Sequence, residues 1–91
     1  MTEMKQVLVV EDEVVIRTAL KRLLERHEYK VSEAGTVKES IDSFNMDDFD
    51  VIISDLRLPG APGTDLIKAT TTPVLIMTSY SSIRSAIDSM K

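Results

Sequence analysis

Several features that the sequence lacks exclude whole classes of protein. It contains no cysteine, so disulfide bonds and thiolate metal sites are excluded. No apolar run approaches the roughly 18 residues that a membrane span needs, and the polar segment Met1–Gln6 does not resemble a secretory signal. No lysine or arginine cluster occurs and the formal net charge is −4, so direct nucleic-acid binding by this segment is disfavoured. We therefore expect a cytoplasmic protein without a membrane partner.

Glycine and proline are also scarce, with three residues of each, and most of them fall within residues 59–63. This segment matches neither the Walker pattern nor G-x-G-x-x-G, which argues against nucleotide binding. The chain has 91 residues, of which 43% are hydrophobic, so we expect one globular domain over residues 1–91.

Short apolar blocks alternate with segments of helical periodicity. Strands are predicted for residues 7–10, 29–34, 51–54 and 74–77, each bounded by polar residues. After the first block, apolar residues recur at helical spacing: Val15, Ile16, Ala19, Leu20, Leu23 and Leu24. The opposite face of that helix is charged and is expected to face solvent: Arg17, Lys21, Arg22 and Glu25.

Three further helices are predicted. Thr36 and Glu39 have the spacing of a capping box, and the helix that they begin would bury Val37, Ile41 and Phe44. A short helix is expected over residues 64–69, and an apolar stripe from Ile83 to Met90 predicts another. The resulting β-α-β-α-β-α-β-α order, with nearly continuous apolar strands, predicts an α/β fold with a doubly wound parallel sheet.

Acidic and hydroxyl side chains follow three of these strands. Glu11 and Asp12 come directly after the first strand, Asp55 ends the third, and Thr78 follows the fourth. Parallel strands end at one edge of the sheet, where ligands bind in such folds. Three neighbouring carboxylates repel one another unless a cation is bound, and Mg²⁺ prefers such oxygen ligands. Asp55 could then act as a nucleophile toward phosphorus.

These motifs together resemble the receiver domains of bacterial two-component response regulators. The similarity covers the strand and acidic pair in residues 7–13, the segment around Asp55 with Pro59, Gly63, and the fourth strand with Thr78. It implies a flavodoxin-like sheet of order 2-1-3-4-5. The fifth strand, with its lysine, and the fifth helix would be absent from this chain, which we expect to be an incomplete receiver domain from a longer protein.

The resemblance also implies a role for each site residue. Asp12, Asp55 and the backbone carbonyl of Arg57 would coordinate Mg²⁺, and Glu11 would act mainly through a metal-bound water. Asp55 would accept a phosphoryl group from a sensor histidine kinase, and Thr78 would be the switch hydroxyl. The domain would be a signalling module and not an enzyme, although it would assist its own phosphotransfer and dephosphorylation. It would control an output domain, with transcription regulation as the expected output.

Other interpretations stay open at this point. A magnesium-dependent phosphohydrolase is one, but such enzymes usually carry a D-x-D nucleophile after the first strand, where this chain has Glu11-Asp12-Glu13. A receiver-like interaction module that is not phosphorylated is another. An uncovered edge at the fourth strand would also favour self-association, so a homodimer is possible.

Overall fold

A parallel four-stranded sheet forms the centre of the computed structural model, which describes residues 4–77. The strands are β1 (Gln6–Val10), β2 (Lys30–Ala34), β3 (Val51–Asp55) and β4 (Val74–Met77), in the spatial order β2-β1-β3-β4. All neighbours are parallel. The predicted fold class is thus confirmed. The predictions for Thr78 and for the helix through Ile83–Met90 lie outside the described residues.

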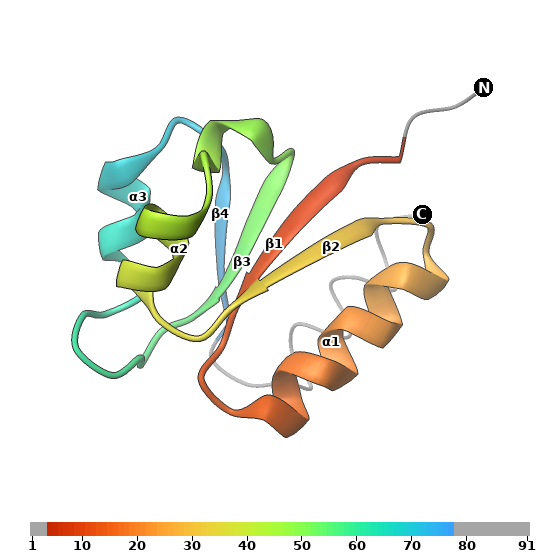
Figure 1. Ribbon diagram of the computed structural model, residues 1–91, viewed down its shortest axis with the longest axis horizontal. Coiled ribbons are helices and arrows are strands. Elements are labelled where there is room, and N and C mark those ends of the chain that lie inside the picture. The colour runs from red at the N-terminus through yellow and green to blue at the C-terminus, as the bar shows by residue number, and fades with distance from the viewer. Residues whose placement is uncertain (1–3, 78–91) are drawn as a thin grey trace.

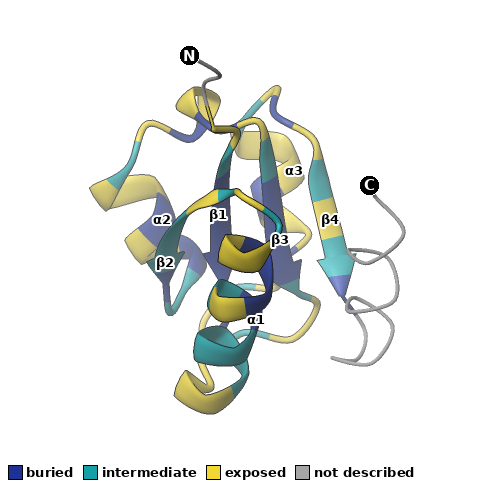
Figure 2. Ribbon diagram, turned by 90° about the vertical axis from the view of Figure 1, so that its right-hand side faces the viewer, coloured by how far each residue is buried: buried dark blue, intermediate teal, exposed yellow. Residues whose placement is uncertain are grey.

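Helices cover both faces of this sheet (Figure 1). The helix α1 (Val14–Arg26) lies on one face, while α2 (Val37–Ser43), the 3₁₀ turn η1 (Met46–Asp48) and α3 (Asp65–Ala69) lie on the other. Val7 and Val9 pack in the cluster with α1, whereas Leu8 and Val10 pack in the cluster with α2 and α3. Because side chains alternate along a strand, a strand covered on both faces must be apolar throughout. Figure 2 shows β1 and β3 as the buried centre of the sheet.

The predicted buried stripe of α1 is correct in its second half and wrong at its start. Leu20, Leu23 and Leu24 are buried, but Val15 is 82% exposed. Figure 1 shows the reason: the first turn of α1 extends past the carboxyl ends of the four described strands. Arg17, which was expected to face solvent, is half-buried.

The capping box before α2 is present, with one difference in its partners. The backbone N–H of Glu39 donates to Thr36 Oγ1 at 3.0 Å, and Glu39 Oε1 accepts from the N–H of Gly35 at 2.9 Å. The predicted burial of Ile41 is wrong, because this side chain is 49% exposed. Ser40 is buried in this helix instead, since its hydroxyl donates to the Thr36 carbonyl at 2.9 Å and so loses no hydrogen bond.

The buried hydroxyl of Thr72, just before β4, contacts the segment just before β3. The Thr72 hydroxyl lies 3.0 Å from the carbonyl oxygen of Met46, the first residue of η1, and 3.2 Å from that of Phe49, which follows η1. Neither η1 nor this contact is predicted from the sequence, because three residues are too few for a periodic pattern. Among residues 4–77, no helix has the length and apolar character needed to cross a membrane.

Replacing Thr72 with valine is expected to lower the free energy of unfolding by about 2 kcal/mol, because the buried hydrogen bond that its hydroxyl shares between the Met46 and Phe49 carbonyls is lost while the side-chain shape is kept. Urea unfolding of the wild type and Thr72→Val measures this difference. The matched control is Thr64→Val, since Thr64 is exposed and its side chain makes no cap hydrogen bond. Equal losses in the two variants would contradict the structural role of the Thr72 hydroxyl.

Candidate functional site: an acidic cluster at the carboxyl edge

Three carboxylates meet where the two central strands end. Val10 pairs with Ser54 in the register of β1 and β3, so Glu11 and Asp55 leave the sheet at the same level. Glu11, Asp12 and Asp55 each offer a carboxylate oxygen, and these oxygens all lie within 4.8 Å of one another. The structure therefore brings together the three acidic residues that the sequence placed at one edge.

The three acids differ in exposure and in their hydrogen bonds. Glu11 is 1% exposed, Asp55 is half-buried and Asp12 is exposed. Glu11 Oε1 accepts from the backbone N–H of Glu13 at 2.9 Å, and Asp55 Oδ1 accepts from the N–H of Arg57 at 3.2 Å. Each of these two carboxylates is thus oriented by the backbone two residues further along the chain.

The pKa of Glu11 is raised to about 7, mainly by burial; hydrogen bonds with Asp12 and Asp55 and repulsion from Asp55 also raise it, and the Glu13 N–H lowers it. In the absence of a cation, Glu11 therefore gains or loses its proton near neutral pH. A divalent cation would neutralise the same repulsion, and the set of carboxylate oxygens fits Mg²⁺. The donor chemistry at this edge is consistent with the expected metal.

Gly63 packs against the end of β3 more closely than any other residue type could. A Cβ at this position would lie 2.1 Å from the Asp55 carbonyl oxygen and 2.5 Å from Ser54 Oγ. The Gly63 N–H also donates to the Leu56 carbonyl at 3.2 Å. The loop between β3 and α3 is therefore held directly against the backbone of Asp55.

Two predicted site residues are not tested by this geometry. Arg57 is exposed, and its N–H bonds to Asp55 as described, but a ligand role for its carbonyl stays a prediction. Thr78 lies outside the described residues.

Sequence reasoning missed Arg17. Its Nη1 donates to the Glu11 carbonyl oxygen at 2.8 Å, so a residue expected at the solvent face instead contacts the acidic turn. A basic residue in the first turns of the helix that follows an acidic pair was the available signal, but helical periodicity alone placed it on the wrong face.

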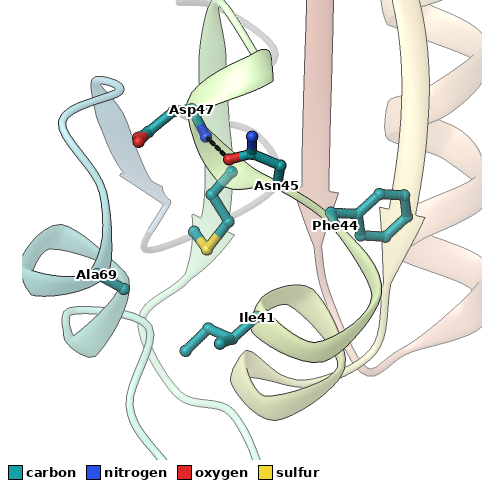
Figure 3. A pocket seen from close by; sticks show the side chains of 6 residues that line it. Ile41, Phe44, Asn45, Asp47 and Ala69 are labelled. Atoms are coloured by element: carbon teal, nitrogen blue, oxygen red, sulfur yellow. Dashed lines mark hydrogen bonds between the residues drawn. The ribbon is translucent and has the colours of Figure 1, made fainter.

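A pocket of about 180 Å³ lies between α2, η1 and α3 (Figure 3). Its lining comes from the end of α2, η1 and the end of α3: Ile41, Phe44, Asn45, Met46, Asp47 and Ala69. These segments precede β3 and β4, so they lie at the amino ends of the strands. The pocket therefore shares no residue with the acidic cluster.

A doubly wound parallel sheet with carboxylates at the carboxyl edge of its central strands defines an α/β domain suited to cation and phosphate chemistry at that edge. The family profile of the response regulator receiver domain matches residues 7–91. The chain belongs to this family.

Individual relatives agree with the family match. The chain is 32% identical over 94 residues to the transcriptional regulatory protein ZraR of Klebsiella oxytoca, covering 98% of this chain and 21% of ZraR. It is 34% identical over 92 residues to the response regulator protein PilR of Pseudomonas aeruginosa, covering 96% of this chain and 21% of PilR. The chain thus spans about a fifth of the length of these two relatives.

The solved structures give the same result. The chemotaxis response regulator CheY4 of Vibrio cholerae matches with a TM-score of 0.74 and 30% identity, over 93% of this chain and 81% of CheY4. The chain is therefore a receiver domain of two-component response regulators, and accepting a phosphoryl group is the general function of this family. Receiver domains are signalling domains that interact with histidine kinases and bind Mg²⁺ through acidic residues. This assignment favours the receiver interpretation over the phosphohydrolase.

Proposed function

We propose that Asp55 is the phosphoacceptor of this receiver domain, with Mg²⁺ held by Asp12, Asp55 and the backbone carbonyl of Arg57, and with Glu11 acting on the metal through water. A carboxylate oxygen of Asp55 attacks the phosphorus of a phosphohistidine, the P–N bond breaks, and the electron pair returns to the imidazole nitrogen. Bound Mg²⁺ would supply positive charge against the transferring oxygens.

The observation that carries this proposal is the meeting of the three carboxylates within 4.8 Å at the end of the central strands. Within the cluster, Glu11 is 1% exposed and is not accessible to a bulky phosphodonor. Asp55 is half-buried, and one of its oxygens is oriented by the Arg57 N–H, which leaves the other oxygen for attack. A fixed and accessible carboxylate beside two others is what an in-line phosphoryl transfer requires.

The partners follow from the family. The phosphodonor is a sensor histidine kinase, and the phosphorylated domain controls an output domain that regulates transcription. Thr78 would act as the switch hydroxyl, in keeping with the resemblance. The domain assists its own phosphotransfer and dephosphorylation in the cytoplasm, and residues 1–91 form an incomplete part of it. A homodimer stays a further prediction.

The test is the intact mass of the purified chain after incubation with acetyl phosphate and Mg²⁺. We expect the mass of one phosphoryl group to be added, and we expect a chelator to prevent the addition because the cluster is then left without its cation. Asp55→Asn should show no gain, since the amide is not a nucleophile. The matched control is Asp50→Asn, which changes an exposed aspartate at the amino end of β3 and should be phosphorylated as the wild type is.

A mass gain that persists in Asp55→Asn would contradict the assignment of Asp55. A wild-type chain that gains no phosphoryl group would instead support the alternative of a receiver-like interaction module that is not phosphorylated.

A further inference from the structure

The backbone of Glu11 is held at both of its polar groups. Its N–H donates to the Ala34 carbonyl at 3.0 Å, which continues the pairing of β1 with β2 beyond the last strand residue. Its carbonyl oxygen accepts from Nη1 of Arg17 at 2.8 Å. The second bond comes from a side chain six residues further along, on the second turn of α1.

The hydrogen bond from Arg17 to the Glu11 carbonyl also affects the orientation of Asp12. The carbonyl of Glu11 and the N–H of Asp12 belong to one planar peptide group, so a bond that orients the carbonyl also orients the amide. The direction in which Asp12 leaves the end of β1 therefore depends on the guanidinium of Arg17. On the other side of the turn, the Glu13 N–H holds the Glu11 carboxylate at 2.9 Å. Together these bonds determine where two of the three clustered carboxylates lie.

The side chain of Arg17 also contacts Glu33 on β2. Its Nε lies 3.4 Å from Glu33 Oε1, at ion-pair distance, although this buried nitrogen makes no aligned hydrogen bond. Lys21, one turn later on α1, pairs with the other oxygen of Glu33 at 3.6 Å. The guanidinium also lies beside Gly35, where a Cβ would be 3.6 Å from Nη1. One side chain on α1 thus connects β2 to the acidic turn.

We propose that Arg17 is a positioning residue for the metal site: it orients the Glu11–Asp12 peptide so that the Asp12 carboxylate faces Asp55. This inference rests on the proposed function. The planar guanidinium suits the role, because one nitrogen binds the Glu11 carbonyl while another lies against Glu33. The single ammonium of lysine can reach one of these partners at a time.

The test measures Mg²⁺ binding directly, by calorimetric titration of the purified chain with MgCl₂. Arg17→Met keeps the aliphatic stem and removes every donor, and we expect its dissociation constant for Mg²⁺ to rise about tenfold, as is usual when a residue that orients a metal ligand is lost. Arg17→Lys should recover part of this loss. Lys21→Met is the matched control: it removes a neighbouring cation that also pairs with Glu33, and its affinity should equal that of the wild type.

A second readout needs no metal. In amide NMR spectra of the metal-free protein, Arg17→Met and Arg17→Lys should shift the Asp12 amide, whereas Lys21→Met should not. Circular dichroism identifies a variant that fails to fold; if Arg17→Met does, the comparison of Arg17→Lys with Lys21→Met decides. A general loss of stability would lower the melting temperature without changing the affinity of the folded fraction.

The outcomes separate the two proposals. If the wild type binds Mg²⁺ and the folded Arg17 variants bind it equally well, with the Asp12 amide unmoved, the positioning role is overturned while the proposed function stands. If the wild type binds no Mg²⁺, the metal site of the proposed function fails, and the positioning role fails with it.

Discussion

Replacing Gly63 with alanine is expected to lower the free energy of unfolding by about 3 kcal/mol or more, at the upper end of the range for overpacked sites. The added Cβ would lie 2.1 Å from the Asp55 carbonyl oxygen, far inside contact distance, and the nearest atom belongs to the backbone and not to a flexible side chain. Relief requires the β3–α3 loop or the end of β3 to move. Because Asp55 is at that end, we also expect slower phosphorylation by acetyl phosphate in the variant that remains folded.

Chemical denaturation measures the stability, and a time course of intact mass measures the phosphorylation. Gly35→Ala is the matched control, because a Cβ at position 35 would meet its nearest atom at an ordinary 3.6 Å. It should change the free energy of unfolding by less than about 1 kcal/mol. If Gly63→Ala has the stability and the phosphorylation rate of the wild type, the loop does not pack tightly against the backbone of Asp55.

The metal-free protein is expected to lose stability as the pH rises from 5 to 8. The pKa of Glu11 is raised from 4.5 to about 7 in the folded state, so its contribution is fully present below pH 4.5 and is lost as the pH rises through 7. At about 1.4 kcal/mol for each pH unit between the two pKa values, the decrease is about 3 kcal/mol. Mg²⁺ binds the folded state and should make the decrease smaller.

The experiment is urea unfolding at several pH values, once with a metal chelator and once with excess Mg²⁺. Glu11→Gln removes this titration, so the difference between the wild type and the variant isolates Glu11 from other groups. The lowered pKa of Asp47, whose carboxylate accepts from Thr70 and Thr71, affects stability only at pH values near and below 3.8, outside this window. Parallel pH profiles for the wild type and Glu11→Gln would contradict a buried, protonated Glu11.

The central strands were predictable because burial on both faces demands uninterrupted apolar residues, as in Val7–Val10. The first turn of α1 was not, because periodicity gives the angle of a side chain around the helix but not how far the helix extends past the sheet. Val15 is therefore exposed, while Arg17 is half-buried because it contacts Glu11 and Glu33. In the seven-residue α2, a local hydrogen bond to Thr36 makes Ser40 the buried residue, which apolar patterning does not detect.

The residues of the acidic site could be predicted from the sequence, but their burial and their contacts could not. Parallel strands must end at one edge, so the meeting of Glu11, Asp12 and Asp55 follows from the strand order. The burial of Glu11 and the contact of Arg17 with its carbonyl depend on how α1 covers that edge. The close approach of Gly63 to Asp55 likewise depends on the path of a loop with little regular structure.

We expect Asp55, and neither of its acidic neighbours, to take the phosphoryl group. An acyl phosphate is reduced by borohydride to an alcohol, so a phosphorylated aspartate becomes homoserine and can be located by peptide mass spectrometry. After treatment with acetyl phosphate, Mg²⁺ and borohydride, we expect homoserine at position 55. Homoserine at position 12, a reduced side chain at position 11, or an acid-stable phosphate on a serine or threonine would contradict the assignment of Asp55 as phosphoacceptor.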